Sequence, residues 1–332
     1  KPDCNQIASD RTANFYRGYV MSRRLNRAEY INTIRDLFGV TNDFHLEQLL
    51  PADGGGGEGF DTTGDTLFTS SIHIEKYLAA AEQITEAILP DRPRSQSPQL
   101  QKARQRILIH QPGWLGKAEP AAREVIAAFV RRAWRRPVSP AEVEELLRLF
   151  ARGSQRGDSF TAAVRLAIQG ALVSPHFLFL AEPEPATTGV QRLADVPLAN
   201  KLSYFLWSSM PDEELLALAE KGQLTDTNVY RAQIRRMLKD PKAAAFGERF
   251  ALQWLDLDRL GSEVKPDATQ YPEFDAALVL AMKGEVVAFF NHLVREDRSL
   301  LELIDSNYTF ANRRLAALYG FPGVTGDELR PV

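Results

Sequence analysis

The sequence of 332 residues holds a single cysteine, Cys4. One cysteine cannot close an intramolecular disulfide, so a disulfide framework is excluded, although this absence does not settle the cellular compartment. The sequence also lacks a Cys-x-x-Cys-His motif, which is the attachment site of c-type haem. We therefore expect no covalent haem in this chain and no redox activity from it.

Long apolar runs are missing as well. No segment approaches the roughly 20 apolar residues of a transmembrane helix, so we predict no membrane span. Segments that alternate apolar and polar residues, as half-buried strands do, are absent at useful length. The composition is otherwise ordinary for a globular protein, with 44% hydrophobic and 25% charged residues, and the net charge of -3 demands no particular partner.

Apolar residues recur at steps of three and four through most of the chain, which predicts an all-α, multi-helix protein of two to three packed units with little or no sheet. The first clear helix has Asn26 as its cap, Glu29 at its third position and Gly39 as a left-handed stop. The same pattern predicts further helices at about 71–89, 119–136, 158–173, 197–207, 211–221, 227–239, 241–256, 272–295 and 309–319.

The segment 139–153 carries a fuller set of helix signals. Ser139 is placed as the cap, Pro140 occupies the first turn, and Glu142 completes the capping box. Gly153 is the predicted stop of this helix.

Proline-rich and polar stretches predict three modules. Residues 89–101 form a polar, proline-rich linker or long loop, and the alternating prolines of 182–189 favour extended backbone. We therefore predict an N-terminal helical module at 1–90, a middle helical module at 91–185, and a C-terminal helical module at 186–332.

Three glycines, Gly54, Gly56 and Gly59, match the Gly-x-Gly-x-x-Gly spacing of a dinucleotide loop. Such a loop must follow a strand and open a helix at its last glycine. Here a helical segment precedes the glycines and about ten further residues follow before a helix can begin. A P-loop is also excluded, because no Gly-Lys-Ser/Thr sequence is present. The match is therefore accidental.

The same segment offers hard oxygen ligands for calcium, and its glycines would let backbone carbonyls turn inward. The spacing departs from that of an EF-hand, because the third and fifth positions would be Gly55 and Gly57. The alternative is a loop whose aspartates cap turns or the next helix. The candidate calcium ligands are Asp53, Glu58, Asp61 and Asp65.

The five histidines are far apart in sequence, and none belongs to a His-Glu-x-x-His pair. His176 lies at a predicted helix break next to Pro175 and is a candidate catalytic base or haem-side ligand. The alternative is a structural histidine, because nothing nearby in sequence completes a triad or a metal site. No Gly-x-Ser-x-Gly elbow supplies a nucleophile.

Positive charge is concentrated in residues 91–136, where eleven lysines and arginines face three acidic residues. This region could attract an acidic polysaccharide or an acidic face of a cytochrome. Nucleic acid is not expected, because no binding motif accompanies the charge. The alternative is that the arginines complement a helix terminus and pair with the acidic helix that follows. The predicted basic patch consists of Arg131, Arg132, Arg135 and Arg136.

Aromatic residues cluster in two segments. Tyr204, Phe205 and Trp207 share one predicted helix, and Phe250 and Trp254 share another. Carbohydrate-binding surfaces use such rings, but an all-α protein also needs them in its core. The sequence favours the core.

The longest motifs resemble one known group of proteins. "RRLNRAEYINTIRDLFGV", "LLPADGGGGEGFDTTGDTL" and "IEKYLAAAEQI" resemble the opening module of exported multidomain proteins that abound in planctomycetes and related bacteria. "FVRRAWRRPVSPAEVEELLRLF" resembles their second helical module. "LANKLSYFLWSSMPDEELLALAEKGQL" and "DSNYTFANRRLAALYGFPGV" resemble the third. The domains of these proteins are mostly of unknown function.

The resemblance implies an extracytoplasmic location, periplasmic or secreted. It also implies a c-type cytochrome domain upstream, which would hold the haem c, and further domains downstream. Because the chain ends at "ELRPV", about where the next domain would begin, we expect it to be a fragment or a processed product. The cytochrome domain and the downstream domains are its expected partners.

Two classes of function follow. The first is a helical binding or scaffold portion of an exported, cytochrome-associated protein, which contacts an extracellular polymer or a redox partner and holds no cofactor of its own except calcium. The second is an enzyme that acts on an extracellular polysaccharide, with its site in a cleft between helical units. A pocket that gathers His176, carboxylates and an exposed aromatic ring would favour the enzyme.

Overall fold

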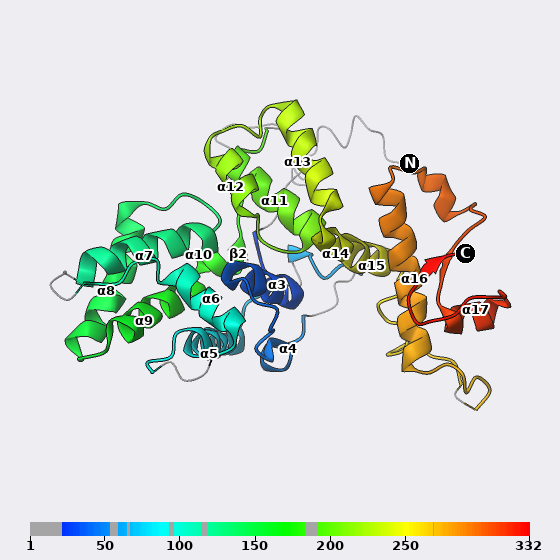
Figure 1. Cartoon of the computed structure of the whole chain (residues 1–332), viewed down its shortest axis with the longest axis horizontal. Coiled ribbons are helices and arrows are strands. Elements are labelled where there is room, and N and C mark those ends of the chain that lie inside the picture. The colour runs from blue at the N-terminus through cyan, green and yellow to red at the C-terminus, as the bar shows by residue number, and fades with distance from the viewer. Residues whose placement is uncertain are drawn as a thin grey trace, which may run out of the picture. The chain divides into compact units, whose positions relative to one another are not determined.

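The computed structural model describes residues 22–53, 59–64, 67–92, 96–113, 118–182, 192–267 and 269–332. The protein is 60% helical and 3% strand, which confirms the predicted all-α class. By compactness the chain divides into two units (Figure 1). Unit 1 comprises 1–56, 61–204 and 209–229, and unit 2 comprises 57–60, 205–208 and 230–332. The three modules expected from the proline-rich and polar stretches near residues 90 and 185 remain a prediction.

Unit 1 contains the helices of the first two thirds of the chain. In order they are α3 (Arg27–Phe38), α4 (Leu46–Leu49), α5 (Ser71–Ile88), α6 (Pro98–Ile107), α7 (Ala118–Ala133), α8 (Pro140–Gln155), α9 (Phe160–Leu172), α10 (Pro175–Leu178), most of α11 (Asp195–Trp207), α12 (Glu213–Glu220) and the start of α13 (Thr227–Lys239). The short strands β1 (Arg23–Arg24) and β2 (Phe179–Leu180) pair antiparallel, with Arg23 opposite Leu180.

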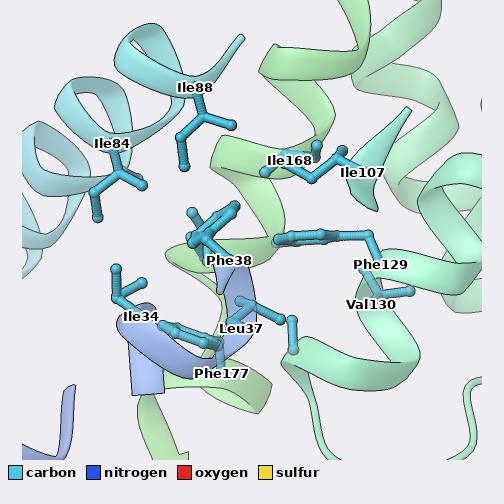
Figure 2. Close-up of a cluster of buried hydrophobic side chains, with 14 of the residues drawn as sticks. Ile34, Leu37, Phe38, Ile84, Ile88, Ile107, Phe129, Val130, Ile168 and Phe177 are labelled. Atoms are coloured by element: carbon cyan, nitrogen blue, oxygen red, sulfur yellow. The ribbon is translucent and has the colours of Figure 1, made fainter. Parts of the chain in front are cut away.

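One hydrophobic core joins α3 to α10. Helix α9 packs against α5, α7 and α8, and α3 contributes its apolar face. Figure 2 shows Phe38 and Phe129 pointing toward each other, with ring centroids 5.8 Å apart. Ile84, Ile88 and Ile168 close around them. Full burial of each such side chain stabilises the fold by about 1.5–3 kcal/mol, so this core is the main source of stability in unit 1.

The predicted caps at the two clearest helix starts are present. Asn26 Oδ1 accepts the backbone N–H of Glu29 at 2.8 Å, and Glu29 Oε2 accepts the backbone N–H of Asn26 at 3.0 Å. Ser139 and Glu142 form the same box at the start of α8. The helix α3 ends at Gly39, whose φ of 69° is left-handed as predicted.

The predicted stop at Gly153 is wrong, because α8 continues to Gln155. Gly153 serves close packing instead: a Cβ added there would lie 3.0 Å from the Cα of Ala163 in α9. The left-handed glycine of this turn is Gly157, with φ of 86°. The polar segment expected to be a linker also contains the start of α6, whose N-cap is Ser97.

Unit 2 contains the remaining elements. They are the end of α11, the rest of α13, a 3-10 turn (Pro241–Ala243), α14 (Ala244–Phe246), a π-helical turn (Gly247–Ala251), α15 (Leu252–Trp254), α16 (Ala276–Arg295), a second 3-10 turn (Leu300–Leu303), β3 (Phe310–Ala311), α17 (Arg313–Tyr319) and β4 (Arg330–Pro331). Strands β3 and β4 pair antiparallel. α16 packs against the π-helical turn, β3 and α17 (Figure 1). A small core gathers Leu278, Ala281, Ala311, Leu315 and Ala316.

α16 has the length and composition of a helix that could cross a membrane. Its most apolar 18-residue window has a mean hydropathy of 1.5, and 28% of that window is buried. The sequence analysis did not single out this helix, because Lys283 and Glu285 interrupt its apolar run. A core helix of a soluble protein passes the same test, so this one helix is weak evidence, and no strong membrane span is shown among the described residues.

Candidate functional site

The four carboxylates predicted to bind calcium are only partly described. Asp53 is already engaged: its Oδ2 accepts the backbone N–H of Arg27 at 2.6 Å, and its Oδ1 lies 2.7 Å from Nη1 of Arg24. No three His, Cys, Asp or Glu side chains within the described ranges gather as metal ligands. Calcium binding therefore stays a prediction. Of its ligands, the described ranges include Asp53 and Asp61, whereas Glu58 and Asp65 lie outside them.

The surroundings of the glycines agree with the exclusion of a dinucleotide loop. The element before them is the short helix α4, and the next helix, α5, begins only at Ser71. Gly59 has a left-handed φ of 86°, and Gly54 and Gly56 lie outside the described residues. The strand–loop–helix order that cradles a pyrophosphate is therefore absent from the described chain around this segment.

A polar cluster that the sequence did not predict surrounds Arg24. This guanidinium is buried and donates to the carbonyl of Leu25 at 3.0 Å and to that of Phe68 at 3.2 Å. Its Nη2 lies 3.4 Å from Nε2 of His73. Nδ1 of His73 in turn lies 2.8 Å from Oγ of Ser70. Arg24 thereby connects β1 to the start of α5.

Ser70 and His73 belong to the capping box at the start of α5. The backbone N–H of Ser70 donates to Nδ1 of His73 at 3.4 Å, and Oγ of Ser70 lies 2.8 Å from the same nitrogen. Burial and the positive charge of Arg24 both lower the pKa of His73, whereas Asp53 opposes them. Asp53 therefore neutralises the buried Arg24, and His73 links the start of α5 to the same guanidinium. Only the Ser-x-x-His spacing in the sequence could have indicated this cluster.

The four arginines of the predicted basic patch have separate surroundings. Arg131 donates to both carboxylate oxygens of Glu220 at 2.8 Å and also lies 2.8 Å from Glu213. Arg132 donates to the carbonyl of Arg106 at 3.3 Å. Burial, together with the charge of Arg106, lowers the pKa of Arg132 to about 10. The alternative left open by the sequence was pairing with the acidic helix that follows, which is α8, and it holds for Arg136, which donates to Glu142. Arg131 pairs instead with α12, which the sequence did not predict.

Arg135 is 1% exposed and lies beyond the end of α7, with a positive φ of 56°. Its guanidinium lies over the rings of Phe177 and Tyr204, with centroids at 5.7 and 5.6 Å. It holds the segment of α10 and β2 against the end of α7 by donating to the carbonyls of Ala133, His176, Phe177 and Phe179. Its contacts are those of a structural arginine, and binding of an acidic polymer by the four arginines stays a prediction.

His176 is 50% exposed and lies beside a carboxylate. Its Nε2 is 3.6 Å from Oε1 of Glu142, and its ring centroid is 4.8 Å from that of Trp134, which is buried. Glu142 also accepts from Arg136 at 2.5 Å and from the cap residue Ser139. These hydrogen bonds, that of Arg136 first, lower the pKa of Glu142 to about 2. The structure thus brings His176 to one carboxylate.

The aromatic residues divide between core and surface. Tyr204 and Trp207 are buried, as the sequence favoured. Phe205 is 57% exposed and Trp254 is 50% exposed. The two predicted clusters therefore each contribute one large ring to the surface of unit 2.

In unit 2 three rings form an aromatic column, which consists of Phe60, Phe250 and Trp254. Phe60 stacks on Phe250 with centroids 5.9 Å apart and planes at 21°. Phe250 stacks on Trp254 at 5.7 Å and 24°. Phe246 and Phe290 lie beside Phe250, at 5.5 and 5.8 Å, and Phe290 is buried. The column is therefore supported from inside and ends in an exposed indole.

The helical segment that carries the column has an unusual winding. The π-helical turn at Gly247–Ala251 lies between α14 and α15. A Cβ at Gly247 would lie 2.8 Å from Oδ1 of Asn291, so only glycine lets α16 approach here. Asn291 also donates to the carbonyl of Ala244 at 3.4 Å. Single π-helical turns of this kind occur often at functional sites.

Comparison with protein families divides the chain into consecutive segments. The model PSD3, "Protein of unknown function (DUF1587)", matches residues 23–90. PSD5, "Protein of unknown function (DUF1595)", matches 121–182, and PSD4, "Protein of unknown function (DUF1592)", matches 193–321. The chain carries these three domains in this order. No curated protein and no solved structure matches it.

The candidate residues are distributed over all three domains. The Arg24 cluster and Asp53 lie in the PSD3 segment, whereas the four arginines and His176 lie in the PSD5 segment. Phe250 and Trp254 lie in the PSD4 segment. The i, i+4 spacing of these two rings was visible in the sequence, but the contribution of Phe60, from a distant segment, was not.

Proposed function

We propose that this chain is a helical binding and scaffold portion of an exported, cytochrome-c-associated multidomain protein. It contacts an extracellular polymer or a redox partner, and the chemistry lies in other domains. Export and the link to a cytochrome rest on the resemblance of the sequence motifs. The haem c belongs to a separate upstream domain in this proposal, and the chain works outside the cytoplasm.

The observation that carries the proposal is where exposed apolar side chains gather. Of the 18 large exposed apolar side chains among the described residues, 13 lie in unit 2. In unit 1 the buried arginines Arg24 and Arg135 donate to backbone carbonyls of the same unit. Exposed apolar side chains that adjoin one another are typical of interaction sites, and unit 2 holds most of the exposed apolar side chains in the described chain.

A second candidate, an enzyme acting on extracellular polysaccharide, is favoured by one contact. His176 beside Glu142 is a histidine–carboxylate pair that could take up a proton at Nε2. The aromatic ring that accompanies it, Trp134, is buried rather than exposed. This pair supports the enzyme less strongly than the surface of unit 2 supports binding.

One experiment separates the two. The purified chain is incubated with a panel of plant and algal polysaccharides, and both retention on the polymer and release of reducing ends are measured. Retention without new reducing ends is the result expected for a binding portion. Turnover that disappears in His176→Ala and in Glu142→Gln would establish the enzyme instead.

A further inference from the structure

Trp254 is half-exposed, and part of its indole stacks on Phe250, with the planes at 24° and the centroids 5.7 Å apart. The exposed half of the residue leaves indole surface that a ring from outside the unit can contact.

The backbone holds this indole in place. In a regular α-helix, positions four apart drift by about 40° around the axis, because each residue turns the chain by about 100°. The wider π-helical turn at Gly247–Ala251 needs more residues for each revolution and offsets this drift. Phe246, Phe250 and Trp254 consequently follow one line along the helix. Phe290, on α16, supports them from inside.

We propose that the exposed indole surface of Trp254 binds the face of a sugar ring in a neutral glycan. This inference rests on the proposed binding function and names the site and the ligand class. The C–H groups on one face of a pyranose make an apolar surface of about the size of an indole ring, and stacking on it removes both from water.

The charges near the indole favour a neutral ligand over an anion. Residues 246–264 contain four acidic and two basic side chains, a net charge of -2, and the ammonium of Lys283 donates to the carbonyl of Asp258 in the same segment. Arg259 is already shared between Asp256 and Glu263, at 3.3 and 2.9 Å. Phosphate, sulfate and uronate groups therefore find no surplus of positive charge in this segment. Sugar hydroxyls, in contrast, can donate to these carboxylates.

The test uses the whole chain on an array of oligosaccharides. The array contains neutral hexasaccharides of glucose, mannose, xylose and galactose in α and β linkages, together with uronic and sulfated hexasaccharides and adenosine monophosphate. The tightest neutral ligand is then titrated by calorimetry into the wild type, Trp254→Ala, Trp254→Phe and a control, Tyr271→Ala. Tyr271 is an equally exposed aromatic residue of unit 2 outside the column.

We expect a neutral hexasaccharide to bind, with at least tenfold weaker affinity in Trp254→Ala. Trp254→Phe, which keeps a flat ring, should lose less, and Tyr271→Ala should bind as the wild type does. The ligand should also reduce acrylamide quenching of the wild type and leave that of Trp254→Phe unchanged. Unaltered melting temperatures show that each variant is folded.

Three results would overturn the inference. Equal affinity of Trp254→Ala and the wild type would place the binding elsewhere on the chain, and the proposed binding function would survive. Binding of only acidic glycans or the nucleotide would exclude a neutral ligand class at this site. Failure of every glycan to bind, with retention by no polymer, would refute the inference and the polymer-binding function together.

Discussion

Unit 1 and unit 2 bury their apolar side chains to different extents. In unit 1 the helices from α3 to α10 share one core in which rings such as Phe38 and Phe129 are almost completely buried. In unit 2 the core around Leu315 is small, and Leu280 on α16 is 73% exposed. The difference indicates that packing alone accounts for much of unit 1, whereas unit 2 keeps apolar surface available for contacts outside itself.

Examples of polar contacts in the two units also differ in how deeply they are buried. Unit 1 places the ion pair of Arg24 and Asp53 inside, with the guanidinium buried. In unit 2 comparable contacts lie near the surface, where the hydroxyl of Tyr319 donates to Glu285 at 2.6 Å. Burial, together with this hydrogen bond, raises the pKa of Tyr319. The contact of Arg24 is therefore part of the interior of unit 1, whereas that of Tyr319 lies at the surface of unit 2.

The largest effect that tests this comparison is expected at Phe129. Phe129→Ala removes a buried ring between α3 and α7 and should lower the free energy of unfolding by about 3–5 kcal/mol. The matched control, Leu280→Ala in unit 2, should change it by less than about 0.5 kcal/mol. Urea unfolding followed by circular dichroism measures both. Equal losses in the two variants would remove the distinction between the units.

The next effect is expected at the buried ion pair. Arg24→Met leaves the carboxylate of Asp53 without its cation and should destabilise the protein by about 3 kcal/mol. Arg259→Met, which breaks the exposed contacts with Asp256 and Glu263, should give no measurable change. Urea unfolding followed by circular dichroism measures the free energy of unfolding of both variants. If Arg24→Met were as stable as the wild type, the ion pair of Arg24 and Asp53 would not stabilise unit 1.

A smaller effect is expected where α8 and α9 approach each other. Gly153→Ala adds a Cβ 3.0 Å from the backbone of Ala163 and should cost about 1–3 kcal/mol. Gly113→Ala is the control, because nothing lies within 4 Å of the added atom. If Gly153→Ala proved as stable as the wild type, the contact between these helices would be looser than the structure has it.

Local signals predicted the helices well, and distant contacts account for what they missed. Asn26 with Glu29, and Ser139 with Glu142, act through neighbours three residues apart, so the sequence alone located both helix starts. Gly153 was assigned as a stop because the sequence does not show that Ala163 packs against it.

The same limit applies to the candidate sites. Arg24 contacts His73, which lies 49 residues away in the sequence, and no local pattern predicts that contact. The aromatic column needs Phe60 beside Phe250, together with a π-helical turn that packs against Asn291. The exposure of Trp254 depends on this tertiary arrangement, which explains why the sequence favoured the core for it.

The smallest effect concerns the dependence of stability on pH. The pKa of Glu142 in the folded protein, about 2, lies below its ordinary value of 4.5. Its stabilising contribution is therefore present above pH 4.5 and is lost as the pH falls toward 2. Because solvent screens this carboxylate, the contribution should stay below about 1 kcal/mol. Glu142→Gln should be less stable than the wild type at pH 6 and equally stable at pH 2, and a constant difference would contradict the assignment.

Hydrogen–deuterium exchange of the whole chain, with and without a saturating neutral hexasaccharide, tests the central claim most directly. The account predicts slow exchange in α7 and α9 of unit 1 whether or not the glycan is present. It also predicts new protection confined to the segment around Gly247–Trp254 in unit 2. Protection that appeared instead around Arg131–Arg136 or His176 would contradict the account, because the binding surface would then lie in unit 1.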